Sequence, residues 1–354
     1  MKIFIKGIGS ISPQNTIQNT LIDADIIQHH TEYLKCIEPV YKNYINPVSL
    51  RRMSRIVKMG VTAAQLCLKD ANLTNTDAII TATGLGCIED TENFLNSIIA
   101  NEEKLLNPTP FIQSTHNTVG SQIAIILKCN NYNATHVHKG SSFESALMDA
   151  LLLMKENEAN NVLLGSSDEM TPNLFKITQR LNLWKKEPIN HLKLSECKTK
   201  GSIAGEGAAF FALTNEANTS NYAVINALDV FYKPATNDAI DQRISLFLAN
   251  NQLKTDEIDL VVYGINGDVK SDGIYNHLME SVFNKSTSTY YKHLCGEYHT
   301  STSFAMWLSS IILKNQVVPN IIKLNNQPIK PINNILIYNH YLNKNHSLIL
   351  LSKC

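Results

Sequence analysis

Strand-like and helix-like segments alternate from one end of this chain to the other, and this alternation restricts its fold more than any other feature. Residues 51–71 carry apolar side chains near every 3.6 positions, which predicts a helix, whereas residues 78–82 form a short apolar run typical of a buried strand. The same patterns predict further helices at 117–127, 142–155, 238–250 and 302–313. They predict further strands at 3–8, 134–138, 161–165, 208–213, 223–230, 260–263, 335–338 and 347–351. Such a succession indicates an α/β layered fold, with the polar stretch 185–202 as a long loop.

One unit occurs twice. QLCLKDANLTNTDAIITATG at 65–84 and SLFLANNQLKTDEIDLVVYG at 245–264 each combine a helix end, a Thr-Asp turn and a buried strand that stops at glycine. Three leucines recur at the same spacing in both copies: Leu66, Leu68 and Leu73 match Leu246, Leu248 and Leu253. Two such units can arise by chance, but a duplicated α/β fold explains them better. This repeated helix–turn–strand unit predicts two similar halves, 1–215 and 216–354.

Composition excludes several classes of function. Formal net charge is zero and no run of five basic residues occurs, so a nucleic-acid partner is not expected. No apolar run approaches the ~20 residues of a membrane span. The seven cysteines are odd in number and irregularly spaced, which indicates reduced thiols in a cytoplasmic protein.

Cofactor and metal signals are weak. Gly7 and Gly9 follow a strand, but Pro13 stands where a dinucleotide-binding helix would begin, so no cofactor is predicted. His136 and His138 share one face of a strand, yet no third ligand is spaced nearby, so no metal is predicted.

Several segments together resemble the β-ketoacyl synthase family, which has the thiolase fold. They are IKGIGSISP at 5–13, RRMSRIVKMGVTAAQLCLKDANL at 51–73, TGLG at 83–86, NPTPFIQSTHNTVGSQIAI at 107–125 and AGEGAAFFAL at 204–213. Lys292 and Gly296 fit the family's lysine-containing loop. The resemblance implies two thiolase-like halves in five layers, αβαβα, with residues 1–215 as the synthase N-terminal-like half.

The family condenses acyl groups with one cysteine and two histidines, and this chain departs from that set. The resemblance aligns Gly140 with the nucleophile, Gly264 with the first histidine and Glu297 with the second, while Lys292 is retained. A shift of two residues would recruit His299 instead of Glu297. The family's glycine-rich loop near the C-terminus is replaced by HYLNKNH at 340–346. Because the nucleophile, both histidines and the glycine-rich loop are altered together, the resemblance implies that none of the family's catalytic residues remains.

Substitute nucleophiles stay open as an alternative. Ser141 lies beside the vacated position, Cys295 lies in the inherited loop, and His299 follows it, so an acyltransferase or thioesterase-like enzyme acting on acyl thioesters remains a rival. For Ser141 the more ordinary reading is a capping box, with Ser141 as N-cap and Glu144 three residues on.

Loss of the nucleophile in this family implies a chain-length-factor-like role. Such a subunit pairs with an active ketosynthase and shapes the tunnel that receives a polyketide, aryl-polyene or fatty-acid-type chain. An acyl carrier protein then acts through the partner, and a homodimer is the other possible assembly. The expected interface comprises 107–125 and 134–139, with Thr115, His116, Thr135, His136, Val137 and His138. Strand alternation would place Thr135 and Val137 on one face, and His136 and His138 on the other.

Overall fold

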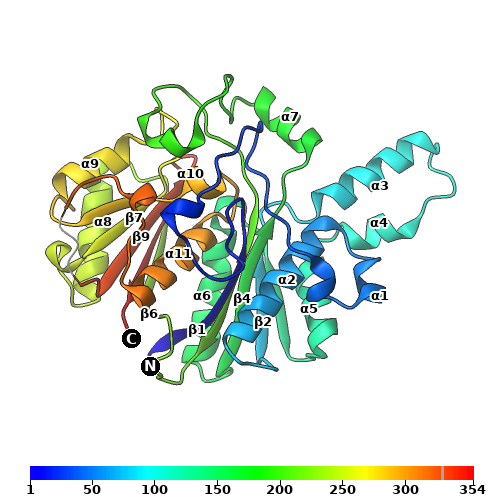
Figure 1. The fold of residues 1–354 in the computed structure, drawn as a ribbon, viewed down its shortest axis with the longest axis horizontal. Coiled ribbons are helices and arrows are strands. Elements are labelled where there is room, and N and C mark those ends of the chain that lie inside the picture. The colour runs from blue at the N-terminus through cyan, green and yellow to red at the C-terminus, as the bar shows by residue number, and fades with distance from the viewer. Residues whose placement is uncertain (328–330) are drawn as a thin grey trace.

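In the part of the chain that the structure describes, ten strands join in one mixed sheet whose order has an internal symmetry. The computed structural model describes residues 1–327 and 331–354 (Figure 1). The sheet order is β3-β2-β4-β5-β1-β6-β10-β9-β7-β8. The strands are β1 (Ile3–Ile11), β2 (Ala78–Ala82), β3 (Tyr132–His136), β4 (Asn161–Asp168), β5 (Gly207–Thr214), β6 (Ala223–Tyr232), β7 (Leu260–Tyr263), β8 (Thr287–Tyr290), β9 (Asn334–Tyr341) and β10 (Asn345–Ser352). Each half contributes five strands, and both halves arrange them in the same way. Counted outward from the central β1–β6 pair, the order is first, fifth, fourth, second and third strand of the half: β1-β5-β4-β2-β3 on one side and β6-β10-β9-β7-β8 on the other.

The helices form three layers, one between the two halves of the sheet and one outside each half (Figure 1). Helices α6 (Ser142–Lys155) and α11 (Thr302–Asn315) contact strands of both halves. Helices α2 (Arg55–Asp70) and α5 (Thr118–Leu127) cover the outer face of the first half. Helices α8 (Asn237–Asn250) and α9 (Gly273–Ser281) cover the outer face of the second half. The predicted five-layer thiolase-like fold is therefore confirmed.

Strand alternation explains how these layers hold together. In β2, Ala78 and Ile80 point into the central core with α6 and α11, whereas Ile79 points to the outer core with α2. Successive side chains of a strand face opposite sides, so a strand buried on both faces is apolar throughout. At β1, a Cβ on Gly9 would lie 2.3 Å from the carbonyl oxygen of Ala63, so glycine is what lets α2 pack against this strand.

The two halves meet over a very short contact. β1 and β6 pair through three residues of each strand, Ile3–Ile5 facing Ala223–Ile225. The echoed units are α2–β2 and α8–β7, and they occupy matching places in the sheet order. The division near residue 215 stays a prediction; it falls between β5, which ends at Thr214, and β6, which begins at Ala223.

Two local expectations were wrong. The first long helix begins at Arg55 and not at 51, because a separate short helix, α1 (Pro47–Leu50), precedes it. Strand β3 ends at His136, so Val137 and His138 lie beyond it and the alternation predicted for them does not hold. The stretch 340–346, which stands where the family's glycine-rich loop is expected, forms the end of β9, a tight turn with left-handed Leu342 and Asn343, and the start of β10.

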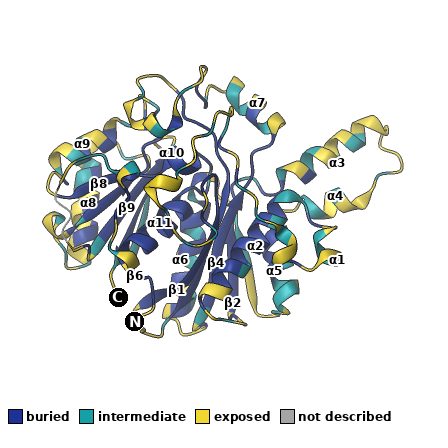
Figure 2. Ribbon diagram, in the orientation of Figure 1, coloured by how far each residue is buried: buried dark blue, intermediate teal, exposed yellow. Residues whose placement is uncertain are grey.

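An arm that the sequence patterns did not reveal projects from the first half. It consists of α3 (Ile88–Ala100) and α4 (Pro108–Gln113), which lie side by side away from the sheet (Figures 1 and 2). Phe94 and Phe111 join the two helices, with ring centroids 5.1 Å apart. The remaining helix in this part of the chain is α7 (Pro172–Arg180), and α10 (Lys292–Cys295) lies in the second half. Among the described residues, no helix has both the length and the apolar character needed to cross a bilayer.

Candidate functional site

The predicted nucleophile position lies at the junction between β3 and α6. A 3-10 turn, Lys139–Ser141, makes this junction, and Gly140 is its buried residue. A Cβ built on Gly140 would lie 2.3 Å from both Cβ and Cγ of Tyr341, far inside any real contact. The side chain of Tyr341 therefore occupies the space into which a residue at 140 would project.

Tyr341 is held in that place by His299. The Tyr341 hydroxyl and His299 Nε2 are 3.2 Å apart, and the two rings have centroids 5.1 Å apart. His299 in turn covers Gly84, where a Cβ would lie 2.2 Å from His299 Cβ. Burial lowers the pKa of His299, while the charges of Asp168 and Glu297 act in the opposite direction. A mostly neutral imidazole that faces a phenol fits a packing role better than a base that faces a thiol.

The Asp168 carboxylate fixes the loops around this pair. Asp168 is the last residue of β4. One of its carboxyl oxygens accepts hydrogen bonds from the Gly84 amide at 2.8 Å and the Thr83 hydroxyl at 2.9 Å. Its second oxygen accepts from the Thr300 amide at 3.0 Å and the Thr300 hydroxyl at 2.8 Å. All four partners donate, two to each oxygen, so the hydrogen-bonding capacity of this buried side chain is used by the surrounding loops.

The first predicted histidine position, Gly264, is filled in a similar way. A Cβ on Gly264 would lie 2.1 Å from Oδ1 of Asn339. Asn339 Nδ2 donates to the Thr302 hydroxyl at 2.8 Å, which orients the amide toward Gly264. Asn339 and Tyr341 are two positions apart in β9, so both point to the same face of the sheet.

The second predicted histidine position, Glu297, forms an ion pair with the retained lysine. Lys292 Nζ lies 2.7 Å from Glu297 Oε2, and Lys292 is fully buried. Asn266 Nδ2 also donates to Glu297 at 2.8 Å. Asp272 accepts from the amides of Asn266 and Gly267, and burial raises its pKa to about 6. These contacts tie the loop after β7 to the loop that carries Lys292.

The candidate substitute nucleophiles do not form a reactive pair. The Cys295 thiol is fully buried, burial raises its pKa well above its usual value, and its Sγ donates to the Gly296 carbonyl. A thiol held in its neutral form is a poor nucleophile. His299 bonds to Tyr341, as described above.

The predicted capping box at Ser141 was wrong. Ser141 is the N-cap of α6 but makes no side-chain cap hydrogen bond. Its neighbour Ser142 takes the local role instead, because its hydroxyl accepts from the His138 amide at 2.8 Å and donates to the Lys139 carbonyl at 2.7 Å. Glu144 is drawn away to the Ser347 hydroxyl of β10, 3.0 Å away.

The predicted interface residues lie on or beside the outer edge of the sheet. Thr115, His116, Val137 and His138 are exposed, and Thr135 and His136 are partly buried. His136 Nε2 lies 2.9 Å from the Asp149 carboxylate, and His138 Nδ1 lies 3.0 Å from the Ser145 hydroxyl, so both imidazoles reach α6. These six residues are not part of the filled site around Gly140.

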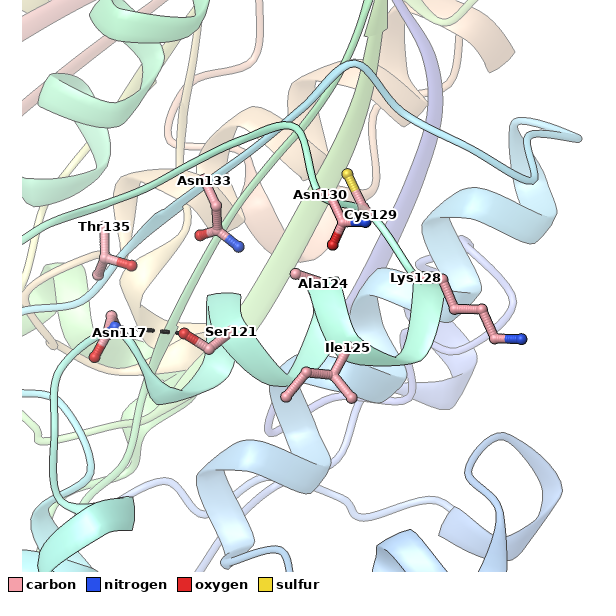
Figure 3. Close-up of a pocket in the computed structure, with 9 residues that line it drawn as sticks. All are labelled: Asn117, Ser121, Ala124, Ile125, Lys128, Cys129, Asn130, Asn133 and Thr135. Atoms are coloured by element: carbon pink, nitrogen blue, oxygen red, sulfur yellow. Dashed lines mark hydrogen bonds between the residues drawn. The ribbon is translucent and has the colours of Figure 1, made fainter.

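A surface hollow of about 570 Å³ lies along the same edge, between α5 and β3 (Figure 3). Its lining includes Asn117, Ser121 and Ile125 from the α5 side and Asn133 and Thr135 from β3. Ile125 is 66% exposed, and the hollow is otherwise mostly polar. Among the described residues, no three His, Cys, Asp or Glu side chains are grouped so that they could hold a metal ion.

Sequence reasoning missed Tyr341 and Asn339. A signal was present, because in β9 the apolar pattern of Ile335 and Ile337 continues on the same face into Asn339 and Tyr341. Polar groups on a buried strand face need partners, and the Tyr341 hydroxyl finds one in His299 while the Asn339 amide nitrogen finds one in Thr302.

Known proteins similar to this chain agree with the architecture. Residues 28–188 match the N-terminal domain of β-ketoacyl synthases. No curated protein is similar enough in sequence to count as a match. The ishigamide ketosynthase/chain length factor superimposes with a TM-score of 0.83 at 16% identity, covering 100% of this chain and 99% of that chain.

Two further solved structures are similar over the same extent. One is AntDE:AntF, a type II PKS acyl-carrier protein in complex with its ketosynthase bound to the hexaketide, with a TM-score of 0.79 at 13% identity. The other is a β-ketoacyl synthase from Burkholderia phymatum STM815, with a TM-score of 0.76 at 13% identity. Each covers 100% of this chain and is itself 99% covered. Residues 28–188 are thus similar to the β-ketoacyl synthase N-terminal domain, and the whole chain has the thiolase-like fold of these solved structures.

Proposed function

We propose that this chain is a non-catalytic, chain-length-factor-like subunit. It pairs with an active ketosynthase and shapes the acyl tunnel in a polyketide, aryl-polyene or fatty-acid-type pathway, while an acyl carrier protein serves the pair. The observation that carries the proposal is the side chain of Tyr341 over Gly140, which leaves no room for a nucleophile at the strand–helix junction. The buried thiol of Cys295 offers no replacement.

The two ends of the sheet differ in a way that supports pairing through β3. At the other end, β8 is covered: the Leu324 amide donates to the Ser288 carbonyl at 2.8 Å, and the Ser288 amide donates to Asn325 Oδ1 at 3.1 Å. A sheet edge with unpaired backbone groups invites another strand, and proteins cover edges that are not used for pairing. The β8 edge is therefore covered, whereas β3 ends the sheet order and pairs with β2 alone among the strands that the structure describes.

The direction of the backbone amides and carbonyls of β3 determines which of them can pair with another strand. The Thr83 amide donates to the His136 carbonyl, so His136 turns its backbone groups toward β2. The direction of the backbone amides and carbonyls alternates from one residue to the next along a strand. Those of Asn133 and Thr135 therefore point outward, away from β2. Their side chains also line the hollow beside α5, so a partner that adds a strand here would fill the hollow as well.

Co-expression with a ketosynthase tests the proposal. We expect the two chains to elute together in size-exclusion chromatography and the ketosynthase to need this chain for full condensing activity. We also expect no acyl adduct on this chain by intact mass after incubation with acyl carrier protein thioesters. Stoichiometric acylation of Ser141, Cys295 or His299 would favour the rival enzyme, and a chain that stays monomeric beside its ketosynthase would contradict pairing.

A further inference from the structure

Three histidines come together where the long loop 185–202 meets two other segments of the chain. His191 lies in a short 3-10 segment of that loop and is fully buried. His293 belongs to α10 and is also fully buried. His29 lies in residues 12–36, which we call the strap, and its ring centroid is 5.6 Å from that of His191. We call these three residues the histidine cluster.

The partners of His191 fix its protonation state. Its Nδ1 lies 2.6 Å from the His293 carbonyl oxygen, which can only accept, so Nδ1 carries the proton. Its Nε2 accepts a hydrogen bond from the His29 backbone amide at 2.8 Å, so Nε2 carries none. A doubly protonated imidazole has no acceptor left, and its Nε2–H would point at the His29 N–H. The link between the loop and the strap therefore exists only while His191 is neutral.

The strap is folded so that it presents this amide to His191. The His29 imidazole donates from Nε2 to the Pro13 carbonyl at 2.7 Å. The side-chain amide of Gln14 makes a pair of hydrogen bonds with the backbone of Ile27, at 2.8 and 3.0 Å. These contacts fold the strap back onto its own beginning and fix the position of the His29 amide.

The 3-10 segment that carries His191 packs over α10. Besides the bond between His191 and His293, the Tyr290 hydroxyl donates to the Leu192 carbonyl at 3.2 Å. The Tyr290 ring also stacks on the His293 imidazole, with centroids 3.8 Å apart. The tip of the loop is therefore held against α10 and the strap together, and His191 is the residue that bonds to both.

The base of the loop is held by contacts that use no histidine. Trp184 and Ser202 form a backbone bridge that joins the beginning and end of the loop. Lys185 is buried beside them and donates to the carbonyls of Thr199 and Gly267. Release of His191 would therefore open the tip of the loop and leave its base in place.

The environment of the cluster opposes protonation. Burial lowers the pKa of His191, its bond to the His293 carbonyl acts in the opposite direction, and the charges of His29 and His30 lower it again. Burial, with a smaller effect of His191, lowers the pKa of His293 to about 3. The other charged or titratable groups that adjoin the cluster along these elements are Lys193 and Glu196 on the loop, Glu32 on the strap, Tyr290, and Lys292, which is paired with Glu297.

We propose that the histidine cluster is a pH-sensitive latch, which holds residues 189–197 closed over α10 at neutral pH and releases them in acid. Both buried histidines take up protons more readily when the loop is open. Each can therefore raise the equilibrium constant for opening by up to about tenfold per pH unit below the ordinary histidine pKa of 6.5. Opening uncovers α10, which carries the lysine of the Lys292–Glu297 pair. The latch goes beyond the proposed function and does not depend on it.

A carboxyl group near the loop titrates in the same range with the opposite sign. Asp272 accepts from the Gly267 amide, and burial raises its pKa to about 6. A raised carboxyl pKa means that the folded arrangement binds the proton more readily, so a fall in pH favours that arrangement. Release of the loop in acid is therefore not the effect expected of Asp272.

Hydrogen exchange followed by mass spectrometry tests the latch. Exchange of peptides that cover 189–197 is measured in the full chain between pH 8 and pH 4.5, with rates corrected for the intrinsic effect of pH. His191→Gln keeps an oxygen that can accept from the His29 amide but does not titrate. His293→Phe keeps an aromatic ring to stack on Tyr290 and does not titrate either.

His277→Gln is the matched control, because it also removes one imidazole. His277 Nε2 lies 2.8 Å from the Asp241 carboxylate, so this residue joins α9 to α8 in the outer layer of the second half. Peptides from α11, whose residues 302–313 are all buried, report whether the core stays folded.

In the unaltered chain and in the control, we expect corrected exchange at 189–197 to rise by about tenfold or more between pH 6.5 and pH 4.5, while α11 stays protected. In the double variant of His191 and His293 we expect a rise of less than about twofold. If His191→Gln already opens the loop at pH 8, His293→Phe alone is compared with the unaltered chain, and its rise should be smaller. An equal rise in the unaltered chain and in the variant compared would overturn the inference. So would no rise in the unaltered chain, or exchange of α11 at the same pH as the loop.

Discussion

At the scale of single residues, the centre of this molecule is defined by glycines that other side chains cover. Tyr341 covers Gly140, Asn339 covers Gly264 and His299 covers Gly84. An alignment can indicate that a position holds glycine, but the residue that fills the freed space comes from a distant part of the chain. The sequence therefore predicted where the family's side chains are absent, and only the structure identified their replacements.

The first prediction concerns Gly140→Cys. The new side chain would collide with Tyr341, and overpacking of a core typically costs about 1–3 kcal/mol of unfolding free energy. Urea denaturation measures this, with Gly273→Cys as control, because a Cβ on Gly273 meets nothing within 4 Å. Equal stability of the Gly140 and Gly273 variants would mean that Tyr341 does not fill this space. The Gly140 variant should also gain no acylation while Tyr341 is present.

The second prediction concerns thiol reactivity. Cys295 is fully buried and burial raises its pKa well above its usual value, so its reactive thiolate form should be scarce at neutral pH. Brief treatment of the native protein with iodoacetamide, followed by peptide mapping, should leave Cys295 unlabelled while exposed Cys354 reacts. Cys295 should react fully after unfolding in urea. Rapid labelling of Cys295 in the folded chain would revive the rival enzyme hypothesis.

At the scale of elements, the arm formed by α3 and α4 depends on a buried acid at its base. Glu169 follows β4 and accepts a hydrogen bond from the Glu89 amide in the first turn of α3, at 3.0 Å. Burial raises the pKa of Glu169 to about 8; the charges of Glu89 and Glu206 also raise it, and Arg55 lowers it. No sequence pattern revealed this link, because it joins two elements that are about 80 positions apart in the chain.

The third prediction follows from that acid. A carboxyl whose pKa is raised by folding stabilises the protein fully below its unfolded pKa of 4.5, and this contribution is lost as the pH rises to about 8. Glu169→Gln keeps an oxygen that can accept from the Glu89 amide but removes the charge. We expect the variant to be more stable than the unaltered chain at pH 9, by about 1–3 kcal/mol, and not at pH 4.

Chemical denaturation at several pH values measures the effect, with exposed Glu280→Gln as the control. A difference between Glu169→Gln and the unaltered chain that does not change with pH would show that folding does not shift the pKa of Glu169. The comparison between variants is needed because other buried acids, such as Glu144 and Asp272, also have raised pKa values.

At the scale of the whole molecule, the layers were predictable and the edges of the sheet were not. Helical and strand periodicities in residues 51–82 and 238–263 specify which faces are buried, and the echoed unit indicates duplication. Strand ends depend on tertiary contacts: β3 stops at His136 because the chain turns into α6, and β8 is covered by the segment around Asn325. These contacts join distant positions and leave no local pattern.

The last prediction concerns that open edge. Val137 lies just beyond β3 and is 36% exposed, so Val137→Asp should leave the isolated chain folded but place a charge where a partner strand would pack. We expect the pair with a ketosynthase to separate in size-exclusion chromatography and the condensing activity of the ketosynthase to fall with it. Leu246→Asp on α8 is the matched control, because Leu246 is also exposed, at 55%, but lies in the opposite outer layer. Circular dichroism should show the same fold for both variants. A pair that survives Val137→Asp as well as Leu246→Asp would place the interface elsewhere, and it would remove the structural reason for regarding the β3 edge as a docking site.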